Sequence, residues 1–203
     1  WLVPVSSPPV SDGAVLVRGE QILLAGPFAD VRGQVPASGR TLDHGDAALI
    51  PGLVNAHTHL ELTGLGGLIP LPQPGFSAWL PKVFEHRPAF SLDSMRQSVR
   101  DGVDRIGSHG TVLCGDINNG SCLGRDIIPA WPHRHVFFEV LGFDRQGLTD
   151  AVGSEMLDHF AALARTSPEA SLAAHAPYST APQVIREAKG WCQRTGRVFS
   201  MHV

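Results

Sequence analysis

Two histidines two residues apart are the first feature of the sequence that suggests chemistry. His57 and His59 lie in an apolar run over residues 53–60, and the two-residue side-chain period of a strand points both imidazoles to one face. Imidazole nitrogen binds zinc or iron at about 2 Å, so same-face neighbours on a strand can share one ion. The pair is therefore a candidate metal site, and two ordinary strand histidines are the alternative interpretation.

Three further polar residues end apolar runs elsewhere in the chain. Asp116 follows residues 112–115, His175 follows residues 172–174, and His202 follows residues 198–201. If these runs are parallel strands of a barrel, their last residues gather with the histidine pair at the carboxyl ends of the strands. Simpler interpretations stay open, because His175 could bond a neighbouring loop and Asp116 could cap the turn that follows it.

The elements that must position these residues are predicted from apolar spacing. Two short runs around Gly19-Glu20 predict a β-hairpin in an opening β segment over residues 1–50. Apolar residues spaced three and four apart then predict helices, the first with Ser91 as N-cap and the last with Ser179 or Thr180 as N-cap. The apolar faces of these helices run over residues 92–106, 152–163 and 184–191, and the helices are expected to end near residues 107–110, before Pro168 and at Gly196. The β-rich runs cover 111–117, 135–141, 171–175 and 197–203.

Strands that alternate with helices predict parallel βα units, hence an α/β fold. No GxGxxG or GxxxxGK[ST] loop follows a strand, and the histidines end strands, so a TIM-type (β/α)8 barrel is favoured over a doubly wound sheet. About 150 residues follow the β segment, whereas a closed barrel typically has roughly 250. We therefore expect residues 51–203 to form the first part of an incomplete barrel.

Composition restricts the partners and the compartment. The 203 residues carry 16 Lys and Arg against 19 Asp and Glu, a net charge of -3 without long runs of one sign, which favours a small molecule over nucleic acid. No window approaches the roughly 20 apolar residues that cross a bilayer. The cysteines are widely spaced and form no CxxC pair, which predicts no disulfide framework and a cytoplasmic location. They are Cys114, Cys122 and Cys192.

Residues 49–59, Leu-Ile-Pro-Gly-Leu-Val-Asn-Ala-His-Thr-His, resemble the amidohydrolase superfamily in its deaminase and chlorohydrolase branch. Residues 13–27 resemble the small N-terminal β-sandwich segment of that family, which extends over residues 1–50. Residues 175–179 resemble its substrate-histidine segment, and residues 200–203 resemble the strand that supplies its third metal histidine.

The resemblance implies a role for each candidate residue. His57, His59 and His202 would bind one divalent metal ion, with zinc expected first and iron or manganese as alternatives, and His175 would orient the substrate. Glu61 and Asp116 would contact the substrate, since Glu61 and residues 76–80 and 115–117 look closest to the aminodeoxyfutalosine deaminases. The only lysines, Lys82 and Lys189, fall in helical stretches, so the carboxylated lysine of two-metal relatives is not expected.

The function that this resemblance implies is metal-dependent hydrolytic deamination of an adenosine-like nucleoside, such as aminodeoxyfutalosine, S-adenosylhomocysteine or methylthioadenosine. A chlorohydrolase or another amidohydrolase acting on C–N bonds is the alternative, and a metal-bound fold remnant or inactive fragment is the non-enzyme alternative. The family's general acid/base Glu is expected three residues beyond the third histidine, past Val203. A complementing C-terminal half or a homo-oligomer is accordingly a possible partner.

Overall fold

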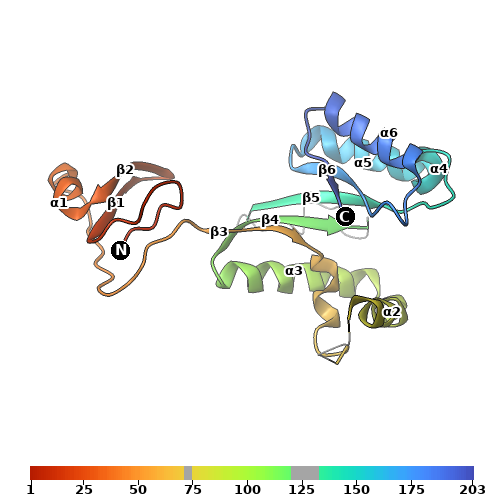
Figure 1. Cartoon of the computed structure of the whole chain (residues 1–203), viewed down its shortest axis with the longest axis horizontal. Coiled ribbons are helices and arrows are strands. Elements are labelled where there is room, and N and C mark those ends of the chain that lie inside the picture. Colours follow the sequence, from red (N-terminus) through yellow and green to blue (C-terminus); the bar gives the residue numbers. More distant parts are fainter. Residues whose placement is uncertain (71–74, 120–132) are drawn as a thin grey trace. The chain divides into compact units, whose positions relative to one another are not determined.

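The computed structural model describes residues 1–70, 75–119 and 133–203 of the chain. These residues form two compact units, Trp1–Gly52 and Leu53–Val203, each with its own sheet. Figure 1 labels the helices and strands of both units. Cys122 lies outside the described residues, whereas Cys114 and Cys192 are buried free thiols.

The first unit contains the hairpin that the sequence predicts. Strands β1 (Gly13–Arg18) and β2 (Gln21–Pro27) pair antiparallel, and Gly19 begins the two-residue turn between them with φ of 59°. Glycine takes this left-handed conformation without a Cβ clash. Helix α1 (Phe28–Val31) and the 3-10 turn η1 (Arg32–Gln34) follow the hairpin. The expected β-sandwich stays a prediction, because the described residues of this unit form one two-stranded sheet.

The second unit is built on a five-stranded sheet whose strands are all parallel and follow chain order. Such a sheet, with helices alongside it, is the arrangement of part of a TIM-type barrel, which confirms the α/β class expected from the sequence. Its strands are β3 (Leu53–Thr58), β4 (Thr111–Asn118), β5 (His133–Val140), β6 (Ala170–Ala174) and β7 (Ser200–Met201).

The helices of this unit lie along the strands, with α3 beside β3 and β4, and α5 and α6 beside β5 and β6 (Figure 1). The sequence predicted three of them, and Ser91 is the N-cap of α3 as expected, because its Oγ accepts the N–H of Ser94 at 3.1 Å. The elements are η2 (Leu60–Leu65), α2 (Phe76–His86), η3 (Arg87–Ala89), α3 (Leu92–Ser108), α4 (Leu148–Val152), α5 (Ser154–Thr166) and α6 (Pro182–Arg194).

Two details of the sequence prediction are wrong at the end of the chain. The N-cap of α6 is Ala181, because the hydroxyls proposed as caps have other partners. Ser179 contacts the ring of His175, and Thr180 donates to the carbonyl of Val140 at 3.3 Å. The final strand is also shorter than residues 197–203, since β7 contains two residues and His202 follows it.

The main core of the second unit lies between the sheet and helices α5 and α6. Phe160 of α5 is 1% exposed, and its ring lies 5.5 Å from that of Phe138 in β5 and 5.3 Å from that of Trp191 in α6. A second cluster joins α3 to β4 through Val99, Val103 and Cys114. These cores hold the strands in register.

None of the described helices has the length and apolar character needed to span a bilayer.

Candidate metal centre

His57 and His59 lie at the carboxyl end of β3, where the strand gives way to η2. His57 is within the strand and His59 is the N-cap residue of η2. Their ring centroids are 5.3 Å apart, as expected for residues on one face of a strand.

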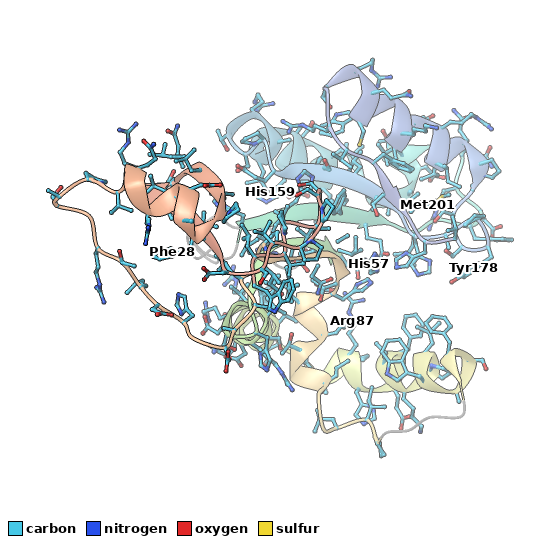
Figure 2. All side chains as sticks on the ribbon, turned by 60° about the vertical axis from the view of Figure 1, so that its left-hand side comes forward. Phe28, His57, Arg87, His159, Tyr178 and Met201 are labelled. Atoms are coloured by element: carbon cyan, nitrogen blue, oxygen red, sulfur yellow. The ribbon has the colours of Figure 1, made fainter. Side chains whose placement is uncertain are left out.

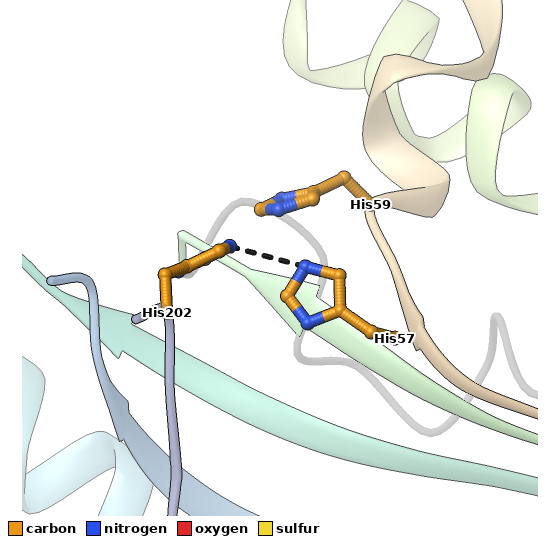
Figure 3. Close-up of side chains that lie close together, drawn as sticks. All are labelled: His57, His59 and His202. Atoms are coloured by element: carbon orange, nitrogen blue, oxygen red, sulfur yellow. Dashed lines mark hydrogen bonds between the residues drawn. The ribbon is translucent and has the colours of Figure 1, made fainter.

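His202 brings a third imidazole to this pair from the far edge of the sheet. The backbone N–H of His202 donates to the carbonyl of His175 at 2.8 Å, which fixes the chain just after β7. Its ring centroid lies 4.6 Å from that of His57 and 5.7 Å from that of His59. Figure 3 shows the three rings converging, with Nε2 of His202 3.0 Å from Nε2 of His57.

The donor atoms fit a divalent ion. Nδ1 of His202 lies 2.8 Å from the carbonyl oxygen of His175, and a carbonyl only accepts, so Nδ1 carries the proton and Nε2 keeps its lone pair. Two nitrogens bound tetrahedrally at about 2.0–2.1 Å stand roughly 3.3 Å apart, close to the distance between the Nε2 atoms of His57 and His202. One donor atom from each of the three histidines lies within 4.8 Å of the other two.

The electrostatic environment favours the neutral form of His57 and His59. The pKa of His59 is lowered to about 4, mainly by burial and to a smaller extent by the neighbouring histidines. Burial and the field of His202 lower the pKa of His57. The carboxylate of Glu139 acts on both in the opposite direction without reversing the shift. A neutral ring offers the lone pair that a metal requires, so His57 and His59 are prepared for coordination at neutral pH.

His175 joins the cluster from the end of β6. Its ring centroid is 4.9 Å from that of His202 and 5.8 Å from that of Tyr178, with which it forms a T-shaped pair. Its Nδ1 is hydrogen-bonded to Oγ of Ser179, which itself donates to the carbonyl of Ala176. The hydroxyl therefore accepts from Nδ1, and Nε2 of His175 is left as an acceptor. Figure 2 shows His57, Tyr178 and Met201 toward one end of the second unit.

Glu61 lies in η2, two residues after His59, and is 2% exposed. Its Oε1 accepts from Nη2 of Arg87 at 2.5 Å in an ion pair whose arginine side is 29% exposed. The structure thus places Glu61 against η3, and the substrate contact expected from the sequence stays a prediction.

Asp116 is buried on the opposite face of the sheet from the histidine cluster. It precedes Ile117, whose side chain packs with Phe137, so the alternation of a strand turns Asp116 toward the helix layer. Its Oδ1 accepts the N–H of Leu60 at 2.9 Å, and its Oδ2 accepts Nε of Arg134 at 2.8 Å. Burial raises the pKa of Asp116, and Arg134 and the Leu60 N–H oppose that rise. These bonds give it a structural role, and its substrate contact stays a prediction.

Glu139 is a member of the site that the sequence did not single out. Together with His175 and His202 it forms a second group of possible metal ligands, whose donor atoms lie within 4.8 Å of one another. A signal was present, because Glu139 is the one charged residue in the apolar run 136–140, close to a strand end. A charge in such a run is costly to bury unless it serves a purpose.

Comparisons with known proteins place this geometry in a family. No protein-family model matches the chain. Over 198 residues the chain is 26% identical to the aminodeoxyfutalosine deaminase of Deinococcus radiodurans, covering 95% of this chain and 45% of that protein. Over 59 residues it is 46% identical to a 5-methylthioadenosine/S-adenosylhomocysteine deaminase of Nitratidesulfovibrio vulgaris, covering 29% of this chain and 13% of that protein.

Solved structures agree with these relatives. An adenosine deaminase from Xanthomonas campestris with bound zinc superposes with a TM-score of 0.72 at 25% identity, covering 100% of this chain and 47% of its own. The aminofutalosine deaminase of Helicobacter pylori gives 0.75 at 23% identity, covering 95% and 46%. The chain belongs to the amidohydrolase superfamily. Among the amidohydrolases that match 95% or more of this chain, the chain spans about half of the relative's length.

Other amidohydrolases share the fold with different reactions. A zinc complex of the atrazine chlorohydrolase of Arthrobacter aurescens gives a TM-score of 0.62 at 17% identity, covering 93% of this chain and 47% of its own. At that identity the likeness concerns the fold alone. Zinc in two of the matching structures nevertheless supports a divalent metal in this superfamily site, in agreement with the histidine donors described above.

Proposed function

We propose that this chain carries the metal-binding half of the active site of a hydrolytic deaminase that acts on an adenosine-like nucleoside. The second unit supplies five strands of a (β/α)8 barrel, and the first unit belongs to the β-sandwich segment. His57, His59 and His202 hold one zinc ion, and His175 orients the substrate beside it.

The observation that supports this proposal most strongly is the approach of His57 and His202. They are 145 residues apart in sequence, yet their Nε2 atoms lie 3.0 Å apart. Two lone pairs this close repel one another unless a proton or a cation lies between them. A divalent ion held by these histidines would supply Lewis-acid activation of water near neutral pH.

The remaining residues of the cluster bind and orient. Nε2 of His175 is an acceptor, because Ser179 fixes the proton on Nδ1. An acceptor suits an N–H donor, and the exocyclic amine of an aminopurine is such a group. The edge of Tyr178 restricts the ring of His175 from the side, so the acceptor keeps one direction. An aromatic amine held in this way would direct the carbon that bears the amine toward His57, His59 and His202.

The experiment is an assay of ammonia release by the complete protein loaded with zinc, using adenosine, methylthioadenosine, S-adenosylhomocysteine and aminodeoxyfutalosine. Release from at least one of these is expected. His59→Ala should abolish it, whereas His159→Ala, at an exposed position on α5, should not. Zinc bound with no ammonia released from any of the four would refute the deaminase and favour a metal-bound fold remnant.

A chlorohydrolase is the second candidate, favoured by the fold shared with the Arthrobacter enzyme. The same zinc-loaded protein should then release chloride from a chlorinated triazine and leave the aminopurines unchanged. The two activities separate clearly because one assay measures chloride and the other ammonia. His175 offers an acceptor and not a donor, which favours an amine-bearing substrate over a halide.

A further inference from the structure

Glu139 lies on the same face of the sheet as the histidine cluster, two residues nearer the amino ends of the strands in register. It follows Phe137 by two residues on β5, so its side chain points to the face on which Phe137 packs with Ala173. In register, Glu139 is beside Ala173, and Ala173 is beside Ser200. His175 and His202 each lie two residues further along their chain segments.

One carboxylate oxygen of Glu139 accepts a hydrogen bond and the other does not. Nδ2 of Asn119 donates to Oε2 at 2.8 Å. The glutamate side chain is only 4% exposed, yet no described residue donates a hydrogen bond to its buried Oε1. A buried oxygen without a hydrogen bond destabilises the folded protein, and more so when it is charged, so such a group is expected to have a function.

Nδ1 of His202 lies 3.5 Å from this oxygen. The same Nδ1 carries a proton and donates to the carbonyl of His175. A carboxylate on the Nδ1 side of an imidazole fixes the ring and increases the electron density on Nε2. In His202, Nε2 is the atom that faces His57.

Two roles for Glu139 therefore compete. It could be a ligand of a second ion together with His175 and His202. Nε2 of His175 could serve such an ion, but His202 would have to offer either its Nδ1 or a second use of its Nε2. Nδ1 of His202 already donates a hydrogen bond to the carbonyl of His175, and Nε2 of His202 faces His57 in the first triad. His202 therefore has no spare lone pair for a second ion, which argues against a ligand role for Glu139.

We propose that Glu139 is a positioning residue that holds His202 through its Nδ1–H side and so aims Nε2 at the ion shared with His57 and His59. Asn119 keeps the carboxylate in place for this task. The inference rests on the metal centre of the proposed function, and it adds a residue from the third strand of the sheet to a site whose ligands come from the first and fifth strands.

The test is zinc affinity of the full chain, measured by competition with a chromophoric chelator, for the wild type, Glu139→Gln and a matched Glu187→Gln. Glu187 is on α6, where it accepts the N–H of Leu148, so its variant repeats the chemical change away from the site. We expect one ion in the wild type, affinity about 10- to 100-fold lower in Glu139→Gln, and less than twofold change in Glu187→Gln. The Co(II) absorption spectrum of Glu139→Gln should also shift, which a purely structural residue would not cause.

Two gentler variants keep the proposal falsifiable if Glu139→Gln fails to fold. Glu139→Asp retains the charge and should lie between wild type and Glu139→Gln, and Asn119→Ala should weaken zinc in the same direction. Wild-type affinity and an unchanged Co(II) spectrum in all of these overturn the proposal. Two ions in the wild type and one in Glu139→Gln overturn it as well, because Glu139 would then be a ligand. No zinc in the wild type refutes the metal centre itself, before any variant is compared.

Discussion

Asp116 accepts the backbone N–H of Leu60 across 2.9 Å, and Leu60 directly follows His59 in the chain. The carboxylate also pairs with Arg134, which is 3% exposed. Asp116→Ala leaves both the guanidinium and the N–H buried without their partner. Removal of one member of a buried ion pair costs about 3–5 kcal/mol, and urea unfolding should show a loss of that order.

The control for this change is Asp93→Ala on α3, whose carboxylate pairs with Arg96 but is 91% exposed. A surface ion pair contributes about 0–1 kcal/mol, so this variant should unfold near the wild-type urea concentration. Equal effects of the two alanine variants would contradict a structural role for Asp116. The double variant Asp116→Ala/Arg134→Met should recover much of the loss, because it removes the unpaired charge.

Zinc should stabilise the protein by an amount that grows with the logarithm of its free concentration above the dissociation constant. At 100 times the dissociation constant the expected gain is about 2.7 kcal/mol, measured as a rise in the thermal midpoint that chelation by EDTA reverses. His202→Ala should abolish this gain, because it removes the ligand that faces His57. His159→Ala should retain it, and a zinc-dependent rise that persists in His202→Ala would place the ion elsewhere.

The parts of the fold that the sequence predicted are those governed by local spacing. Helix α3 shows this, because its apolar residues and the Ser91 cap are all within one segment. The histidine pair was also predictable, since a two-residue period fixes the face of both rings. His202 needed the resemblance to the amidohydrolases, because nothing local says that residues 145 apart meet.

The parts that sequence reasoning missed depend on contacts between distant segments. Glu139 has its partners in Asn119, twenty residues away, and in His202. The orientation of Asp116 is set by strand register, and a shift of one residue would have turned it to the other face. The N-cap of α6 was mispredicted because the hydroxyl of Ser179 is hydrogen-bonded to the ring of His175 and does not cap the helix. Each miss involves a polar group whose partner is chosen by tertiary packing.

The unfolding free energy of the metal-free protein should fall as pH decreases from 6.5 toward 4. His59 has an unfolded pKa of 6.5 and a folded pKa of about 4, mainly because burial opposes its charge. Between these values the unfolded chain binds a proton that the folded chain does not, so protonation favours unfolding. Above pH 6.5 this effect is absent.

The measurement is a series of urea titrations from pH 7.5 to pH 4.5 in EDTA. His59→Asn removes the titrating ring and should flatten the dependence, whereas His159→Asn, at an exposed position, should leave it as in the wild type. An identical pH dependence in the wild type and His59→Asn would show that His59 is not the residue that destabilises the folded protein in acid.

Ser179→Ala should impair turnover more than it impairs folding. The serine hydroxyl bonds Nδ1 of His175 and leaves Nε2 as the acceptor for the substrate amine. Without it the imidazole can rotate and change tautomer, and misplacement of a binding group by about 1 Å can cost up to roughly 10²-fold in rate. We expect kcat/KM for the active nucleoside to fall by about 10- to 100-fold while zinc content and thermal midpoint stay near those of the wild type.

The chain contains a matched control for Ser179→Ala. Ser108, at the end of α3, lies 3.2 Å from Nδ1 of His109 and donates to the carbonyl of Arg105, so it repeats the serine–histidine contact on an exposed surface. Ser108→Ala should leave kcat/KM unchanged. If Ser179→Ala also kept full activity, the direction of His175 would not depend on its hydroxyl partner, and the edge contact of Tyr178 would be the remaining constraint on the ring. Tyr178→Ala would then be expected to produce the loss in kcat/KM that Ser179→Ala did not.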